Sequence, residues 1–395
     1  MVKISNRALQ FISLGFFVSF IITLFYCVFF VASEKQAVGS DVVSFLTGAL
    51  VIRNGEQKNI YDFLSQLSFQ QQLIRPYEDV GLLPFRNLPV FAAVFIPLTY
   101  ISLQQAYKFY LGILILVLVY VSYLSKKNFG NSIKFPFWSL LPFIFIPNLA
   151  ALFNGQFALW VLLILLLIHK FIKSENYFWA GAISSLLFVK LQYIIAIPFI
   201  FFLIPKKKGY LTGFLTCSFI VILLSILISG PKTLVGYLPF LVRTESAAFG
   251  SRPWQMYTFF SVLKYLPAIS KLSSTLLLTI NTAFYLLVLG FFARIARKIP
   301  FDKAFASAVL FSVAFSVHAL NHDLSVVMVP IFIFLNIFFG RGRQRVKFSS
   351  LLIAIIFFIL PLFSFLRIAP LASIAFLFIG LYLLKPVIPF SPTSD

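Results

Sequence analysis

The sequence predicts an all-α protein, a polytopic integral membrane bundle of about twelve transmembrane helices. Apolar residues make up 61% of the 395 residues and charged residues only 11%, which is more apolar surface than a soluble fold can bury. Runs such as 159–168 and 331–339 carry no charge and do not alternate with a period of two. Several segments approach the length of about 20 residues that a helix needs to cross a bilayer, so helices are expected rather than a barrel.

Basic residues give the chain a formal net charge of +21, but they occur in short clusters between the apolar segments. The clusters lie at residues 3–7, 126–134, 170–173, 206–208, 294–298, 341–347 and 385. None forms a basic face interleaved with aromatic residues, so nucleic-acid binding is not expected. Basic loops favour the cytoplasm, and we place every cluster and both termini on that side.

This placement fixes the order of the crossings. They are predicted at 8–32, 106–124, 136–153, 156–172, 177–190, 191–205, 209–229, 273–293, 304–319, 324–339, 348–366 and 370–385. The proline-bearing segment 88–101 is then re-entrant or interfacial. In an alternative topology 88–101 is a full span and 177–205 is a single span, which leaves two basic clusters outside. We expect one membrane domain over residues 1–395, with extracytoplasmic loops at 33–88 and 230–272.

Acidic residues gather in the first of these loops, since six of the eleven lie between residues 33 and 88. Asp41 stands near the head of this polar stretch. Apolar residues at 42, 45, 46, 49 and 52 repeat with a helical period and predict a helix at the membrane surface that begins at Asp41. A carboxylate at this position either stabilises the helix N-terminus or carries chemistry. Both interpretations fit the sequence.

Several cations are expected on the same side as Asp41, in particular Arg86, Lys190 and Arg252. Grouped donors of this kind can hold a phosphate where no metal does so. Lys190 follows an apolar run, where an ammonium is costly unless it reaches water or an anion. It therefore either extends to the membrane interface or binds a ligand.

His318 and His322 are four residues apart, so on a continuous helix they would share a face, and Asp323 follows directly. This spacing suits zinc, a ligand contact or packing at a helix end, and without a third ligand it is a weak metal signal. The chain has no Gly-x-x-x-x-Gly-Lys, Gly-x-Gly-x-x-Gly or Asp-x-Asp motif. We therefore expect no metal and no cofactor.

Four segments resemble glycosyltransferase family 87, polytopic GT-C enzymes that use polyprenol-phosphate sugars and include bacterial mannosyltransferases. The first is 41–62, with an acidic residue after the first span and an ending similar to Gly-x-x-Ile-Tyr. The others are the proline-containing 88–98, the Gly-Gln turn at 155–156, and 181–192 with Lys190. Asn-Leu-Pro at 87–89 replaces the usual Tyr-Pro-Pro, and a leucine replaces the proline after Lys190, so the substrate does not carry over.

The resemblance implies an inverting hexosyltransferase of the cell membrane with its active site outside the cytoplasm, and mannose is the expected sugar. The expected partners are a polyprenyl-phosphate sugar donor, a lipid or glycan acceptor, and membrane lipids. Asp41 would be the general base, because an aspartate is ionised at neutral pH. The residues expected to bind substrate are Lys190, Arg86, Arg252, His322, Asp323 and Gln156.

Two other classes of function stay open. A transporter or flippase of a lipid-linked or anionic substrate would place ionisable residues in the middle of spans, whereas the charges here lie at predicted ends. A polymerase or ligase acting on lipid-linked sugars would carry its catalytic loop later in the chain, and the loop 230–271 contains Glu245. Substitution of Glu245 and of Asp41 distinguishes that class from the transferase.

Overall fold

The computed structural model describes residues 6–77, 80–129, 138–245, 249, 252–339 and 344–384, so parts of the basic clusters at 3–7, 126–134, 341–347 and 385 lie outside the described residues. All regular secondary structure in these ranges is helical, which confirms the predicted all-α class. The α-helices in chain order are α1 (Asn6–Tyr26), α2 (Glu34–Val38), α3 (Val42–Arg53), α4 (Phe63–Ile74), α5 (Pro89–Ala93), α6 (Leu103–Phe129), α7 (Leu141–Ile144), α8 (Ile146–Phe153), α9 (Ala158–Lys173), α10 (Tyr177–Ser184), α11 (Ala196–Leu203), α12 (Lys207–Ser229), α13 (Pro231–Thr244), α14 (Phe259–Tyr265), α15 (Ser274–Ile295), α16 (Phe301–Phe315), α17 (Met328–Phe339), α18 (Gln344–Ile359) and α19 (Ala369–Leu383). The tighter helical segments used below are η2 (Gln57–Asn59), η3 (Ile96–Tyr100), η6 (Ser185–Ile195) and η10 (Asn321–Val327).

Five segments of the described chain are long and apolar enough to cross a membrane. They are Leu103–Phe129, Tyr177–Leu203, Lys207–Ser229, Ser274–Lys298 and Asn321–Phe339. Several of the other predicted crossings hold shorter helices; that at 136–153, for example, contains α7 and α8, which are separated at Phe145 before a proline. The structure supports a membrane-embedded helical bundle and does not establish the predicted count of about twelve.

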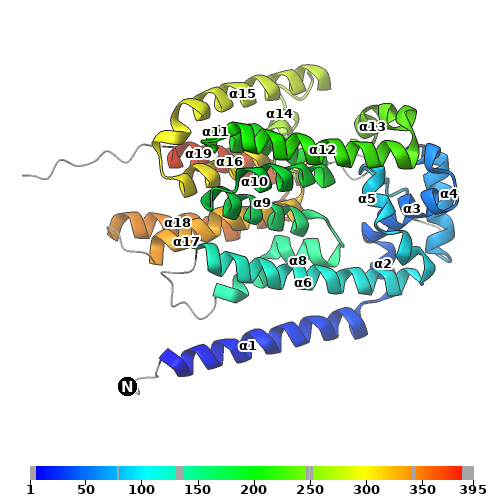
Figure 1. Ribbon diagram of the computed structural model, residues 1–395, viewed down its shortest axis with the longest axis horizontal. Helices are drawn as coiled ribbons and strands as arrows, with labels where there is room; N and C mark the ends of the chain where they lie inside the picture. Colours follow the sequence, from blue (N-terminus) through cyan, green and yellow to red (C-terminus); the bar gives the residue numbers. More distant parts are fainter. Residues whose placement is uncertain are drawn as a thin grey trace, which may run out of the picture.

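The two ends of the bundle differ in character (Figure 1). Helices α2–α5 and α13 form a cap at one end, whereas the described basic clusters meet at the other. There the Arg297 guanidinium donates to the carbonyl of Ile204 at 2.7 Å, next to the lysines 206–208. Lys173, which ends α9, pairs with Asp302 at the start of α16 at 2.9 Å. These clusters can therefore share one membrane surface, as their assignment to a single side requires.

The segment Tyr177–Leu203 doubles back on itself around Lys190. A Cβ placed on Gly209 would lie 3.6 Å from the Cβ of Tyr177, and the rings of Phe201 and Tyr210 lie 6.3 Å apart. Both ends of the segment therefore meet the same end of α12, while Lys190 between them leaves helical geometry at φ −137° and ψ 93°. The segment is long enough to cross once. These contacts instead favour the predicted pair of short crossings with Lys190 at the turn.

Helices α10 and α12 approach each other through two glycines. A Cβ on Gly181 would lie 2.0 Å from the carbonyl oxygen of Tyr210, and a Cβ on Gly213 would lie 2.0 Å from that of Phe178. Neither position has room for a side chain. This close contact fixes α10 against α12, and so positions η6, which follows α10 and carries Lys190.

Gly213→Ala should destabilise the protein by about 1–3 kcal/mol, because the added methyl group forces two backbones apart. Gly209→Ala lies one turn away on the same helix, where the added methyl group would make only ordinary contacts. It should melt at or slightly above the temperature of the unmodified protein, since alanine favours a helix over glycine. Thermal unfolding of both variants in one detergent measures the difference. Equal melting temperatures would contradict the close packing.

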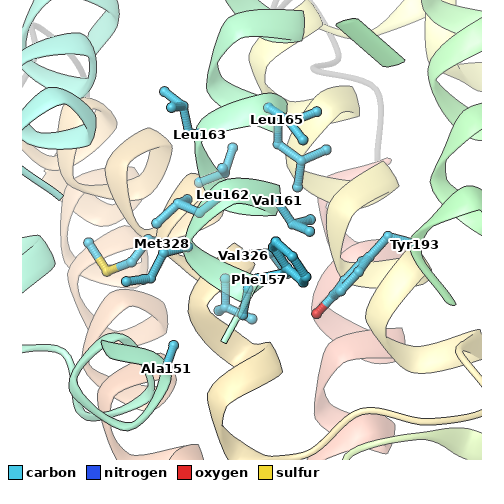
Figure 2. Close-up of a cluster of buried hydrophobic side chains, with 14 of the residues drawn as sticks. Ala151, Phe157, Val161, Leu162, Leu163, Leu165, Tyr193, Val326 and Met328 are labelled. Carbon is cyan, nitrogen blue, oxygen red and sulfur yellow. The ribbon is translucent and has the colours of Figure 1, made fainter. Parts of the chain in front are cut away.

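Helix α9 lies at the centre of the apolar core. Figure 2 shows its buried Val161, Leu162 and Leu165 close to Val326 of η10 and Met328 of α17. Helix α9 begins directly after the turn at 154–156, and η10 carries His322 and Asp323. The core thus fixes two segments that reach the cap.

Helix α3 begins at Val42, directly after Asp41, where the apolar period predicted a helix. It does not lie at a surface, however, because Val42 to Ala49 and Val51 are buried. Contacts with α4, α5, η3 and α6 cover it on several sides. The apolar period predicted a helix with one buried and one exposed face. Segments distant in the sequence cover the second face as well.

Candidate active site

A cavity of about 760 Å³ lies where the cap meets the bundle. Its walls come from the start of α3, the segment 83–87, the turn after α8, the tip of η6, the end of α13 and the segment before η10. Its polar lining residues are Asp41, Ser44, Arg86, Asn87, Asn154, Gln156, Lys190, Gln192, Glu245, His318 and His322. Five of the seven side chains predicted to form the site therefore reach one cavity.

Asp41 is the N-cap residue of α3, but its carboxylate makes no capping hydrogen bond. Its backbone N–H donates to the carbonyl of Asn154 at 3.0 Å, which ties the start of α3 to the turn after α8. No hydrogen bond to the Asp41 carboxylate occurs within the described chain. Asp41 therefore lies at the N-terminus of α3 as predicted, but its carboxylate does not cap the helix by a hydrogen bond and lines the cavity.

The environment of Asp41 tunes its ionisation. Burial raises its pKa to about 6, against the opposing attraction of the Lys190 ammonium. Asp323 raises the pKa further, whereas Arg86 and His318 lower it. An acid with such a pKa is ionised at neutral pH and accepts a proton more readily than an exposed aspartate does. Asp41 can therefore act as a base without a partner residue.

Lys190 forms an ion pair with Asp323, which is fully buried beside the cavity. The Asp323 carboxylate also accepts the backbone N–H of Leu320 at 2.9 Å, and Nε2 of His322 lies 3.5 Å from it. The Tyr193 hydroxyl donates to the Asp323 carbonyl at 2.6 Å. Asp323, predicted to bind substrate, is thus occupied by Lys190 and η10, and it positions the ammonium at the cavity wall.

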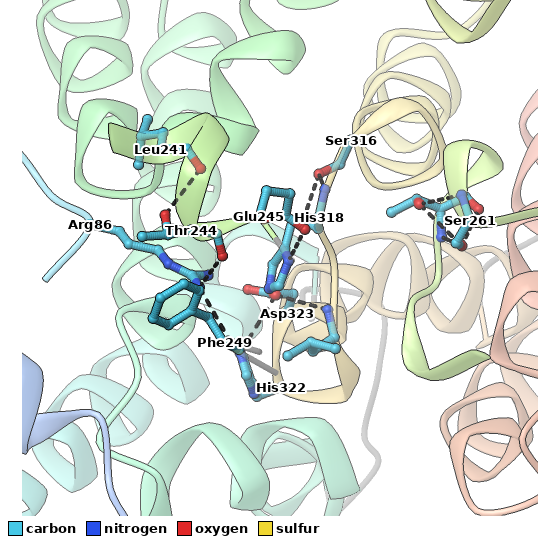
Figure 3. Close-up of polar contacts among 12 residues, drawn as sticks. Arg86, Leu241, Thr244, Glu245, Phe249, Ser261, Ser316, His318, His322 and Asp323 are labelled. Carbon is cyan, nitrogen blue, oxygen red and sulfur yellow. Dashed lines mark hydrogen bonds and ion pairs between the residues drawn. The ribbon is translucent and has the colours of Figure 1, made fainter. Parts of the chain in front are cut away.

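Arg86 reaches from the segment before α5 to the end of α13 within the cap. Its guanidinium donates to the carbonyls of Thr244 at 2.6 Å and Phe249 at 3.3 Å (Figure 3), and its own carbonyl accepts the Tyr237 hydroxyl at 2.9 Å. Burial lowers the pKa of Arg86, while Glu245 and Asp41 favour its charged form. An arginine stays protonated under such opposing influences. It therefore brings a fixed positive charge to the cavity.

Glu245 and His318 form a pair that the sequence did not place in this site. Oε1 of Glu245 lies 3.0 Å from Nδ1 of His318, and Figure 3 shows the pair beside Arg86. His318 precedes η10, and its N–H donates to the Ser316 hydroxyl at 3.2 Å. His318 and His322 therefore do not share a continuous helical face, although both line the cavity. No three His, Cys, Asp or Glu side chains in the described ranges come together as a metal site.

Of two further residues predicted to bind substrate, one lines the cavity and the other does not. Gln156 lines the cavity from the turn that also accepts the Asp41 N–H. Arg252 is not among the lining residues; it is exposed and its guanidinium lies 5.8 Å from the ring centre of Trp254. The loop that contains Arg252 does contribute to the cavity, through Glu245 and Phe249. The side chain of Arg252 itself lies near Trp254 and not at the cavity.

The family model for glycosyltransferase family 87 matches residues 85–319, which is more than half of the chain. Arg86, Lys190, Glu245 and His318 lie within the matched residues, and Asp41 precedes them. No curated protein and no solved structure matches the chain.

Proposed function

The chain belongs to glycosyltransferase family 87, and on this premise we propose that it moves a hexose from a polyprenyl-phosphate donor to an acceptor hydroxyl. Mannose is the first sugar to test. The observation that supports the proposal is the Asp41 carboxylate, which faces a cavity holding Arg86 and Lys190 and has no hydrogen bond among the described residues. A base beside cations is the arrangement that deprotonates a hydroxyl while an anion leaves.

In the proposed step, the acceptor oxygen attacks the anomeric carbon and gives its proton to Asp41. The bond between that carbon and the phosphate oxygen breaks, and its electron pair leaves with polyprenyl phosphate. The departing phosphate gains negative charge, which Arg86 and Lys190 stabilise as hydrogen-bond donors. His318, whose Nδ1 lies 3.0 Å from Oε1 of Glu245, also lines this cavity.

The apolar wall of the cavity suits a lipid-linked donor. Leu238 and Val242 of α13 and Leu278 of α15 line the cavity and are also 61%, 75% and 42% exposed. Apolar side chains can face the outside of a membrane-embedded bundle where lipid covers them. The polyprenyl tail would therefore leave the cavity between α13 and α15, with its phosphate beside Arg86.

The expected side of the reaction follows from charge. The cavity lies at the cap, opposite the end of the bundle that carries the described parts of the basic clusters at 126–134, 170–173, 206–208 and 294–298. Basic loops favour the cytoplasm, so the cavity and the loop 33–88 are assigned to the extracytoplasmic side.

The donor class can be tested with purified protein in detergent. Labelled mannose is offered either as polyprenyl-phosphate-mannose or as a nucleotide-linked mannose, with a membrane lipid extract as acceptor and EDTA present. We expect label in a new product from the lipid-linked donor alone. Transfer from the nucleotide sugar alone would overturn the donor assignment, and loss of transfer with EDTA would overturn the metal-free mechanism.

The pKa of Asp41 predicts how the rate depends on pH. Burial raises this pKa to about 6, and the base must be unprotonated to accept the acceptor proton. We therefore expect kcat/KM to be level above the pKa and to fall by about tenfold for each pH unit below it. A transfer assay over this range, with stability checked at each pH, measures the profile. A rate that does not change through this range would contradict Asp41 as the base.

A further inference from the structure

A second cavity, of about 720 Å³, lies against a different face of α13. Lys232, Thr233, Gly236, Phe240 and Arg243 of α13 line it, whereas Leu238, Leu241 and Val242 of the same helix line the candidate active site. The opposite wall comes from η2 and the residues up to Asp62. Helix α13 therefore separates the two cavities.

The second cavity carries an excess of positive charge. Lys58, Lys232 and Arg243 line it and form no ion pair within the described part of the chain. Asp62 is the acidic lining residue, and its Oδ1 accepts the backbone N–H of Ser65 at 2.8 Å to begin α4. Cations that converge without acidic partners create a potential that favours an anion.

The two segments that supply these cations are held together. The Thr233 hydroxyl lies 3.2 Å from the carbonyl of Lys58 and 2.8 Å from that of Ser229. The ring centres of Tyr61 and Phe240 are 5.3 Å apart. The cavity is thus formed by contacts between η2 and the junction of α12 with α13, and the Lys58 and Thr233 that meet there are 175 positions apart in the sequence.

The outer face of α13 indicates which class of anion the second cavity would bind. Val235, Leu238 and Val242 are 78%, 61% and 75% exposed, and Lys232 and Arg243 flank them along the helix. A helix with an exposed apolar face and basic flanks lies in the interface of a membrane and attracts anionic lipids. We propose that the second cavity binds the phosphate of an anionic phospholipid, whose acyl chains lie along the apolar face of α13. Lys58, Lys232 and Arg243, which would hold the phosphate, take no part in the transfer step, whereas Leu238 and Val242 of the apolar face also line the candidate active site.

The test measures lipid binding, so it does not depend on sugar transfer. A fluorescent phosphatidylglycerol is titrated into the purified full chain in a neutral detergent, with fluorescent phosphatidylcholine as the comparison. The triple variant Lys58→Gln/Lys232→Gln/Arg243→Gln should bind phosphatidylglycerol at least about tenfold more weakly. The control variant Lys35→Gln/Lys264→Gln/Lys271→Gln removes the same charge from positions that do not line either cavity and should bind like the unmodified protein.

Three results would overturn the proposal. They are unchanged binding by the triple variant, equal weakening in the triple and control variants, and displacement of phosphatidylglycerol by millimolar inorganic phosphate. The last result would assign the cavity to a free anion instead of a lipid headgroup. Melting temperatures check that the variants fold, and Lys232→Gln alone replaces the triple variant if the latter does not.

Discussion

Replacing Asp41 with asparagine should lower sugar transfer by about 10²–10⁴-fold and leave the fold intact. The amide has the shape of the carboxylate but cannot accept the acceptor proton. The folded state favours the protonated acid, because burial raises the pKa of Asp41 to about 6. Ionised Asp41 therefore costs stability at neutral pH, and its removal should leave the melting temperature unchanged or higher. Initial rates from a labelled lipid-linked donor and thermal unfolding measure the two effects.

Asp62→Asn is the matched control for this substitution. Asp62 lies in the same cap but outside the candidate active site, and its role is to begin α4 through the N–H of Ser65. Asparagine begins helices about as well as aspartate. The control should retain most of the transfer. An Asp41→Asn variant as active as this control would show that another group removes the proton.

Replacing Lys190 with methionine should destabilise the protein by about 3–5 kcal/mol, because it leaves the fully buried Asp323 carboxylate without its partner. The side chain of Lys190 is only 11% exposed, so water compensates little for the lost charge. Thermal unfolding in detergent measures the loss. A variant that melts with the unmodified protein would show that the ion pair does not form.

The double variant Lys190→Met/Asp323→Asn separates stability from function. It removes both buried charges and keeps an oxygen that can accept the N–H of Leu320, so most of the stability should return. Transfer should stay low, because the phosphate loses the ammonium in the cavity wall. Recovery of transfer together with stability would show that Lys190 acts only through the fold.

Local sequence patterns predicted the fold class and the helix that follows Asp41. The apolar composition indicated a helical membrane protein, and the period from Val42 onward placed a helix directly after Asp41. These features depend on residues close together in the chain.

Long-range pairing explains what the sequence did not reveal. The ion pair of Lys190 with Asp323 and the contact of Glu245 with His318 join residues that are 133 and 73 positions apart. No local period encodes such partners. Arg252 had the right charge and loop for a phosphate ligand, but the fold directs it to Trp254. Residue type and expected membrane side therefore selected five residues that line the cavity. Tertiary contacts decide which side chains reach it.

The anomeric configuration of the product tests the central claim most directly. Transfer in one displacement, with Asp41 as base and polyprenyl phosphate as leaving group, must invert the anomeric carbon. NMR of the product formed from a donor of known configuration should show the opposite configuration. Retention of the donor configuration would exclude a single displacement from the opposite face and would contradict the role assigned to Asp41.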